Sequence, residues 1–324
     1  MGYYPCQASG IHAESDMKRI VVVGSLNVDF VARTPVLPRE GQTVLGYSLD
    51  KFPGGKGANQ STALARLGAY VTHVGKIGTD DHAQILRRSL EEAGVHLTGL
   101  IEDDSTQTGI AMIQIADNGA NTIVVIPGAN LRLLPPDLDP FVPLLQEADF
   151  IAIQNEIPTE TNLRVAQIGR EAGAMVIYNP APFQNESDQI GLLADLVVPN
   201  EIELSELTSL PVTTENEIEV AAGKLLEKGK TKAVVVTLGA RGSMVKDQKG
   251  AELFPAVNVK AVDTTAAGDA FIAGMIWSLS EGNELRKSVQ VANEVAGYAV
   301  TILGAQSSLP TREQLERFRS QLKK

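Results

Sequence analysis

Short runs of apolar, mostly β-branched residues alternate along the chain with stretches in which apolar residues recur at helical spacing. Five such runs predict strands that are buried on both faces, at residues 20–23, 150–153, 175–178, 196–198 and 233–236, and residues 71–77 are strand-like. Helical spacing predicts helices at residues 57–67, 81–93 and 159–172. Gly68 and Gly94 follow the first two helices, where glycine commonly ends a helix. The alternation predicts an α/β fold with three layers, a central and mostly parallel sheet flanked by helices on both faces.

Two stretches interrupt this rhythm with the signature of hairpins. Residues 28–50 contain short extended runs around Pro35, Pro38 and Gly41. Residues 108–126 contain GIAMIQIA and NTIVVI on either side of an Asp-Asn-Gly turn. Because so few strands do not fold alone, we expect residues of about 28–52 and 108–127 to form a small β-sheet lid over the edge of the main domain. Such a lid would exclude water from a site or pair with a second subunit.

The last third of the chain is predicted to be helical, at residues 268–279, 284–303 and 311–322. Since no repeat, low-complexity tract or linker divides the chain, we expect one domain over residues 17–324. Residues 1–16 precede the first strongly apolar run, and we expect them to be a disordered leader or a tag.

Charge and composition narrow the classes of partner. The net charge of −11 argues against nucleic acid and against an anionic membrane as partners. The single cysteine, Cys6, cannot form an internal disulfide, which agrees with a reducing compartment. No apolar run is long enough for a signal peptide or a membrane span. We therefore expect a cytoplasmic protein.

The segment VDTTAAGD at residues 262–269 carries the strongest candidate chemistry. It opens an apolar helix, and its small residues would let a ligand approach the free N–H groups of the first turn. These groups and the helix dipole favour an anion, such as a phosphoryl group in transfer. A carboxylate at Asp269 would accept a proton from an attacking hydroxyl. The structural alternative is that Asp269 only complements the helix dipole.

A second candidate is FPGGKGANQ at residues 52–60, where two glycines precede a lysine at a helix start. Such a loop suits a close approach of backbone to polar ligand atoms. It is neither a phosphate-binding Walker loop nor the dinucleotide pattern G-x-G-x-x-G. The alternative is a tight turn followed by a solvated lysine.

The third candidate is the pair Asn27 and Asp29, directly after the first predicted strand. Alternation places both on one side, and ligands of open α/β sheets bind at the carboxyl ends of strands. An amide and a carboxylate suit the hydroxyl groups of a sugar. The alternative is an Asx turn that closes the strand.

Together, the segments GSLNVD, FPGGKGANQ, PNEIE, TLGARG and VDTTAAGDAF, in this order, resemble the ribokinase family of carbohydrate kinases. The resemblance runs from about residue 18 to the C-terminus. It implies an ATP-dependent kinase that phosphorylates the primary hydroxyl of a sugar, with D-ribose and its O5 as the first choice. It also implies magnesium, an activating potassium ion and a homodimer formed through the lid.

The resemblance assigns roles to matching residues. Asp269 would be the catalytic base, and the anion hole would be formed by Ala266, Ala267 and Gly268. The sugar would be held, with Asp269, by Asn27, Asp29, Gly54, Gly55, Asn59 and Glu156, and Lys56 would contact phosphate or substrate. ATP and magnesium would be bound by Asn200, Glu203, Thr237, Leu238, Gly239, Ala240, Arg241, Gly242, Gly268 and Asn293. Potassium would be bound by Asp263, Thr265, Ala299, Ile302, Gly304 and Ser308, in part through backbone carbonyls.

Three alternatives stay open at this point. The first is a kinase for another substrate, such as deoxyribose, fructose or a nucleoside. The second is a sugar-binding regulator without catalysis, against which the complete set of site residues argues. The third is a nicotinamide-dependent dehydrogenase, which the missing dinucleotide pattern disfavours.

Overall fold

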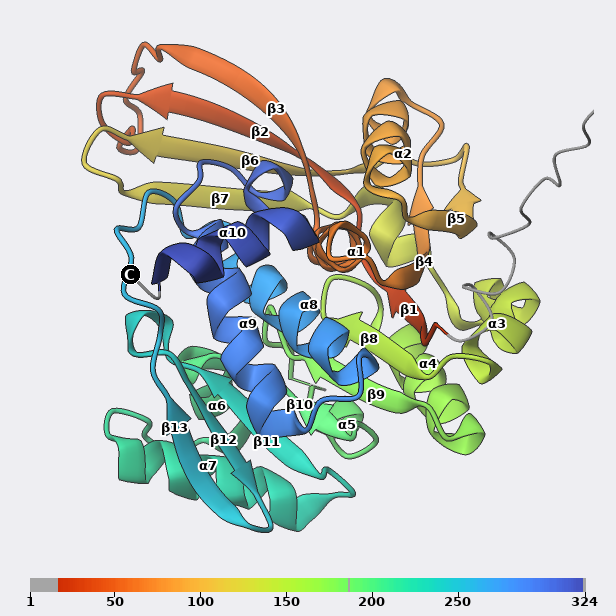
Figure 1. Ribbon diagram of the computed structural model, residues 1–324. Coiled ribbons are helices and arrows are strands. Elements are labelled where there is room, and N and C mark those ends of the chain that lie inside the picture. Colours follow the sequence, from red (N-terminus) through yellow and green to blue (C-terminus); the bar gives the residue numbers. More distant parts are fainter. Residues whose placement is uncertain (1–16, 186, 323–324) are drawn as a thin grey trace, which may run out of the picture.

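A computed structural model describes residues 17–185 and 187–322. The predicted leader at residues 1–16 lies outside the described residues. In the described part the elements form a large sheet between two layers of helices, and a second, smaller sheet beside it (Figure 1). The three-layer α/β prediction is confirmed.

The large sheet has nine strands in the order β13-β12-β11-β10-β9-β8-β1-β4-β5. Its strands are β1 (Arg19–Val23), β4 (Tyr70–Ile77), β5 (His96–Glu102), β8 (Phe150–Gln154), β9 (Met175–Asn179), β10 (Leu196–Val197), β11 (Ala233–Thr237), β12 (Ser243–Asp247) and β13 (Gly250–Phe254). The pairs from β5 to β11 are parallel, and only the β11–β12 and β12–β13 pairs are antiparallel. The sheet is therefore mostly parallel, and the carboxyl ends of its parallel strands meet at one edge.

Helices cover both faces of this sheet because its central strands are apolar on both sides. In β1, Ile20 and Val22 belong to one core cluster, whereas Val21 and Val23 belong to another. The first face packs on α1 (Lys56–Arg66), α2 (Asp81–Ala93), α8 (Ala267–Ser280), α9 (Leu285–Ala299) and α10 (Arg312–Leu322). The opposite side packs on α3 (Val142–Gln146), α4 (Thr159–Ala172), α5 (Ser187–Gly191), α6 (Glu201–Thr208) and α7 (Glu215–Lys228).

The small sheet has four strands in the order β3-β2-β6-β7 and extends to one side of the main domain (Figure 1). Its strands are β2 (Asn27–Thr34), β3 (Ser48–Gly54), β6 (Gly109–Ala116) and β7 (Asn121–Ile126). The two predicted hairpins are confirmed, and β2 joins them by pairing in parallel with β6. Many apolar side chains of this sheet are exposed, among them Leu49 at 63%, Ile123 at 56% and Val124 at 60%.

Two parts of the sequence prediction were incomplete or wrong. Strand β5 at one edge of the large sheet and the β12–β13 hairpin at the other were not predicted. The helix predicted at 284–303 ends at Ala299, where the N–H groups of Thr301 and Ile302 bond to carbonyls only three residues back, and the carbonyl of Val300 accepts the N–H groups of Val262 and Asp263. The residues after the helix therefore form a loop beside the start of α8.

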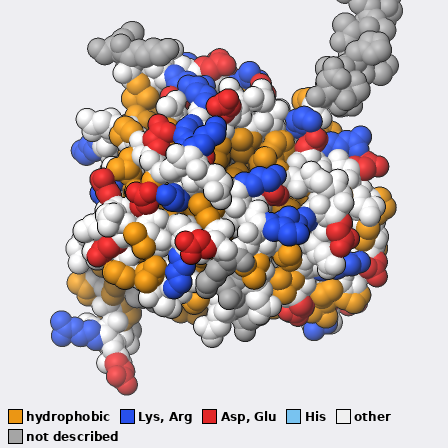
Figure 2. Space-filling view, turned by 90° about the horizontal axis from the view of Figure 1, so that it is seen from below, with side chains coloured by type: hydrophobic (Ala, Val, Ile, Leu, Met, Phe, Trp, Pro, Cys, Tyr) orange, Lys and Arg blue, Asp and Glu red, His pale blue; other side chains and the backbone are white. Residues whose placement is uncertain are grey.

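The remaining surface shows charges of both signs. On the face drawn in Figure 2, basic and acidic side chains of the described residues are interspersed with hydrophobic ones. Within the described residues, no helix is both long enough and apolar enough to span a membrane.

Candidate active site

Helix α8 begins with an open N-terminus. Ala266 precedes it in a left-handed conformation with φ of 59°, and no side chain caps the helix. The N–H of Ala267 bonds to the carbonyl of Thr264 at 3.2 Å. A Cβ built on Gly268 would meet no atom within 4 Å, so the space in front of the first turn is open. A ligand can therefore approach the remaining N–H groups of this turn.

Asp269 lies in that first turn and is buried, with 5% of its surface exposed. Its carboxylate accepts a hydrogen bond from Asn59 Nδ2 at 2.9 Å and another from Gln60 Nε2 at 3.1 Å. Gln60 is held in turn by Gln154, whose Nε2 donates to Gln60 Oε1 at 2.8 Å. Burial raises the pKa of Asp269, although the Lys56 charge and the two amides act in the opposite direction. This carboxylate is thus positioned by a network and tuned toward accepting a proton.

The Gly-Gly loop lies directly against the start of β2. Gly55 has φ of 89°, and a Cβ there would come within 2.7 Å of the backbone nitrogen of Asn27. A Cβ on Gly54 would come within 2.3 Å of Asp29 Oδ2. Only glycine permits both approaches. The predicted sugar-binding residues of the two segments are therefore neighbours in space.

Asn27 is oriented by a residue that the sequence did not reveal. Its Oδ1 accepts a hydrogen bond from Asn130 Nδ2 at 2.8 Å. Asn130 is itself buried and bonds both the N–H and the carbonyl of Leu26, at 2.9 and 3.1 Å. The turn between β1 and β2 is thereby fixed.

The carboxylate of Asp29 is also strongly perturbed. Burial, together with the charges of Glu156 and Asp269, raises the pKa of Asp29 from 3.8 to about 7. The three carboxylates therefore lie within electrostatic range of one another.

Lys56 is the cation among these carboxylates. Burial alone would lower the pKa of Lys56, but the charges of Asp269, Glu156 and Glu203 outweigh it and raise the pKa. Glu156 is held by the backbone N–H of Lys56 at 3.1 Å and by the Ser25 hydroxyl. The structure thus brings Lys56 together with three predicted carboxylates, and each of the four residues comes from a separate segment of the chain: Lys56, Glu156, Glu203 and Asp269.

The PNEIE and TLGARG segments also meet. Asn200 pairs with Thr237 in an isolated bridge, and the N–H of Thr237 bonds to the carbonyl of Pro199 at 3.0 Å. Asn200 caps α6 together with Glu203, each side chain accepting the other's backbone N–H at 2.9 Å. Burial is the main reason that the pKa of Glu203 is raised.

The TLGARG segment forms a tight turn after β11. Leu238 is buried, and its N–H bonds to the carbonyl of Gly242 at 2.8 Å. Gly239 and Gly242 have positive φ, Ala240 is exposed, and Arg241 forms an ion pair with Glu201. The turn is therefore tied to the start of α6.

Asn293 has a structural role in the fold. Its Nδ2 donates to Ser243 Oγ and to the carbonyl of Phe254, both at 3.1 Å. These bonds hold α9 against the β12–β13 hairpin. The predicted adenine contact of Asn293 stays a prediction.

The predicted potassium residues come from two loops that Asp263 joins. Its Oδ1 accepts from the N–H and hydroxyl of Thr265, at 2.9 and 2.7 Å, and its Oδ2 accepts from the N–H of Gly304 at 2.8 Å. These hydrogen bonds outweigh burial and lower the pKa of Asp263. Ala299 accepts the N–H of Ile302 at 3.1 Å, and the Ser308 hydroxyl donates to Ala305 at 2.7 Å. Hydrogen bonds thus join Asp263, Thr265 and Gly304 directly. Among the described residues, no hydrogen bond links Ala299, Ile302 or Ser308 to these three.

The sequence missed four residues that position this site: Ser25, Gln60, Asn130 and Gln154. Gln60 had a usable signal, because it directly follows Asn59 near the start of the helix after Gly-Gly. The other three become functional candidates only through contacts with residues far away in the chain.

The sequence profile of the pfkB family carbohydrate kinases matches residues 17–312 of this chain. The chain belongs to this family. The prediction of an ATP-dependent carbohydrate kinase is thereby confirmed at the level of the family.

Individual relatives of this kinase align over nearly their whole length. It is 35% identical to a ribokinase of Haemophilus influenzae over 301 residues, which cover 93% of this chain and 98% of the relative. It is 36% identical to a deoxyribokinase of Salmonella typhimurium over 304 residues, which cover 93% of this chain and 98% of the relative. Among solved structures, Arabidopsis thaliana ribokinase complexed with ribose and ATP shares 31% identity and a TM-score of 0.86, covering 93% of this kinase and 98% of that chain.

Proposed function

We propose that this kinase transfers the γ-phosphoryl group of ATP to O5 of D-ribose, with Asp269 as the base. One observation carries the proposal: a buried carboxylate, held by two amides, lies in the first turn of a helix whose N-terminus is open. This places a proton acceptor beside a site for developing phosphoryl charge.

Asp269 accepts the proton of the sugar hydroxyl as the oxygen attacks phosphorus. Each carboxylate oxygen accepts one hydrogen bond from a side-chain amide and has a second lone pair that is available for the proton. The N–H groups of Gly268 and Asp269 in the first turn and the helix dipole stabilise the charge on the transferred group. Lys56 neutralises negative charge in the same region. Attack forms the new O–P bond while the bond to the leaving ADP breaks.

The sugar is held by amide, carboxylate and backbone groups that match hydroxyls. These residues are Asn27, Asp29, Gly54, Gly55, Asn59 and Glu156. The Oδ1 atom of Asn59 is buried and has no hydrogen-bond partner among the described residues. A sugar hydroxyl would supply the missing donor, which lowers the cost of burying this oxygen.

Ribose is favoured among sugars by two kinds of support. The ribokinase relative and the ribokinase solved with ribose and ATP both align over most of this chain. The deoxyribokinase relative is equally similar, so deoxyribose is the second candidate. The two substrates differ by one hydroxyl, and a site built to bond that hydroxyl rejects the sugar without it.

The nucleotide would lie along the segments that meet at the end of β11. Thr237, Leu238, Gly239, Ala240, Arg241 and Gly242 would border ATP, with Gly268 at the phosphates and Asn293 near adenine. Asn200 and Glu203 offer oxygen atoms, which Mg²⁺ prefers, and Glu203 Oε1 is left free by the capping bonds. Mg²⁺ commonly takes its other ligands from phosphates and water and neutralises their charge.

The oxygen atoms of the loops that Asp263 joins suit a potassium ion. Carboxylate, hydroxyl and backbone carbonyl oxygens are the ligands of a hard cation. These would come from Asp263, Thr265, Ala299, Ile302, Gly304 and Ser308. The cation would stabilise the loop that leads into Ala266 and the first turn of α8.

The small sheet would act as a lid over the sugar and as the interface of a homodimer. Its strand β2 carries Asn27 and Asp29 at one end. Its exposed apolar side chains on the face that carries Asp29, Ile123 and Val125 among them, would be buried by a second copy. We extend the proposal to one domain over residues 17–324. Use of ATP as the donor agrees with a cytoplasmic enzyme.

Release of ADP, measured with ATP, Mg²⁺ and K⁺ and a panel of sugars, tests the substrate. The proposal expects D-ribose to give a higher kcat/KM than 2-deoxyribose, fructose or a nucleoside. A clear preference for another sugar would keep the mechanism and discard ribose. Failure of every sugar would contradict the proposed reaction.

A further inference from the structure

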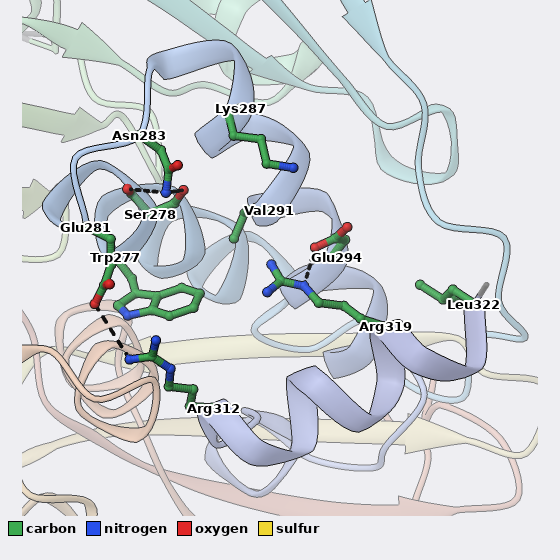
Figure 3. A pocket seen from close by; sticks show the side chains of 10 residues that line it. All are labelled: Trp277, Ser278, Glu281, Asn283, Lys287, Val291, Glu294, Arg312, Arg319 and Leu322. Carbon is green, nitrogen blue, oxygen red and sulfur yellow. Dashed lines mark hydrogen bonds and ion pairs between the residues drawn. The ribbon is translucent and has the colours of Figure 1, made fainter.

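A cavity of about 470 Å³ lies between helices α8, α9 and α10, apart from the candidate active site. Its lining includes Trp277 of α8, Lys287 and Glu294 of α9, and Arg312 of α10. Figure 3 shows these side chains arranged around one space, with Arg312 beside the indole of Trp277. The volume is in the range of small-molecule sites.

Trp277 supplies an unused hydrogen-bond donor. The residue is 6% exposed, and its Nε1–H is buried without a partner among the described residues. A buried indole N–H normally has an acceptor, and a missing one costs free energy. The Nε1 atom has almost no accessible surface, so only a rearrangement of its neighbours would expose this donor to a ligand.

The charges around the cavity favour an anion. Lys287, Arg312 and Arg319 line it, against the carboxylates of Glu281 and Glu294. Arg319 is firmly paired with Glu294 at 2.6 Å, which leaves the other two cations more available.

Arg312 and Lys287 are the available cations. Arg312 is held loosely, 3.8 Å from Glu281 and 3.6 Å from Glu316, with its guanidinium 5.6 Å from the centre of the Trp277 ring. Lys287 forms no ion pair or hydrogen bond with any described residue. The two side chains can therefore turn toward a bound oxyanion at little cost.

We propose that this cavity binds a small organic oxyanion, a metabolite that carries a carboxylate or phosphate group. Lys287 and Arg312 bind its anionic oxygens, and the indole of Trp277 lines the site beside Arg312. Val291 and the indole give the organic part an apolar wall. The cavity is larger than a bare phosphate ion requires, so an organic frame fits it better than inorganic phosphate.

Fluorescence titration of the full chain tests this directly, because Trp277 is the only tryptophan in the sequence. The probes are citrate, glycerol 3-phosphate and inorganic phosphate at constant ionic strength, with glycerol as the neutral control. Calorimetry with the same probes detects binding that leaves the emission unchanged. We expect saturable binding of citrate or glycerol 3-phosphate. The probe that binds more tightly shows whether the site prefers a carboxylate or a phosphate group.

Variants locate the binding. Lys287→Gln and Arg312→Gln should each weaken it by about tenfold, the loss expected for a charge-assisted hydrogen bond. The exposed Lys249→Gln serves as the matched control and should leave binding unchanged. Neither substitution at the cavity should change the kinetics of the kinase without the oxyanion.

Three outcomes would overturn the proposal. The first is the absence of saturable binding by both methods. The second is equal binding by the Lys287→Gln variant and the native chain. The third is binding that Lys56→Gln abolishes while Lys287→Gln preserves it, which would place the anion at the candidate active site.

Discussion

Asn59 donates a hydrogen bond of 2.9 Å to Asp269, which lies 210 positions later in the chain. Asn59 is in the first turn of α1, and Asp269 is in the first turn of α8. The bond therefore joins the two segments that carry the resemblance to sugar kinases. It also links a predicted sugar-binding residue to the proposed base.

Asn59→Ala should lower kcat by about tenfold or more, because a hydrogen bond to a buried carboxylate is lost. It should also change the pH profile. Asp269 acts as a base only when ionised, so activity falls as the pH decreases through its raised pKa. Asn59 holds that pKa down, so its removal should move the acid limb of kcat to higher pH. An acid limb that stays in place, or moves lower, would contradict this role. The exposed amide of Gln167 offers the control variant Gln167→Ala.

Asp29→Asn should weaken sugar binding and alter the pH dependence of stability. Between the ordinary pKa of 3.8 and the folded value of about 7, the folded protein binds more protons at Asp29 than the unfolded chain does. Stability is therefore lost as the pH rises through this window. The variant lacks this loss, so its Tm relative to the native protein should be higher at about pH 8 than at about pH 5. The expected difference is on the order of 2 °C or more.

The exposed Asp50, on the same small sheet, gives the control Asp50→Asn. An equal relative Tm of Asp29→Asn at both pH values would contradict the assigned pKa. An unchanged KM for the sugar would contradict the binding role.

Glu203→Gln separates the charge of Glu203 from its capping bond. Glutamine can still accept the N–H of Asn200, so α6 should remain capped. The loss of charge should raise the Mg²⁺ concentration needed for half-maximal activity by about tenfold. Glu217 caps α7 in the same way through Thr214, and Glu217→Gln is the matched control. A Mg²⁺ dependence that changes equally in both variants would argue against a role of Glu203 in metal binding.

The proposed dimer predicts that the native chain has about twice the monomer mass of 34.5 kDa. Ile123→Lys with Val125→Lys places two charges on the exposed face of β7 and should give monomers by light scattering. Val220→Lys introduces the same kind of charge on α7 and should leave the dimer intact. A monomeric native chain would contradict the interface.

Local patterns were enough to predict most elements but not how they meet. GIAMIQIA and NTIVVI gave the β6–β7 hairpin because the turn and the alternation lie within the segment itself. The parallel pairing of β2 with β6 joins residues about 80 positions apart, and no local pattern encodes it. The end of α9 was misplaced because no breaker residue marks it: the chain turns there through bonds from Thr301 and Ile302 to carbonyls three residues back, and a tertiary bond from Val262 accompanies the turn.

The same limit applies to the candidate site. Asp269, Lys56 and Asn59 could be found because they stand in glycine-rich segments at helix starts. Asn130 and Gln154 lie in segments without such a signal, and only their bonds to Leu26, Asn27 and Gln60 show what they do.

Asp269→Asn tests the central claim most directly. Asparagine has nearly the same shape but cannot take the proton from the sugar hydroxyl. ADP release with ATP, Mg²⁺, K⁺ and D-ribose should fall by about a hundredfold or more in kcat, while circular dichroism and the binding of ribose stay close to native. Turnover within a fewfold of the native rate would contradict Asp269 as the base.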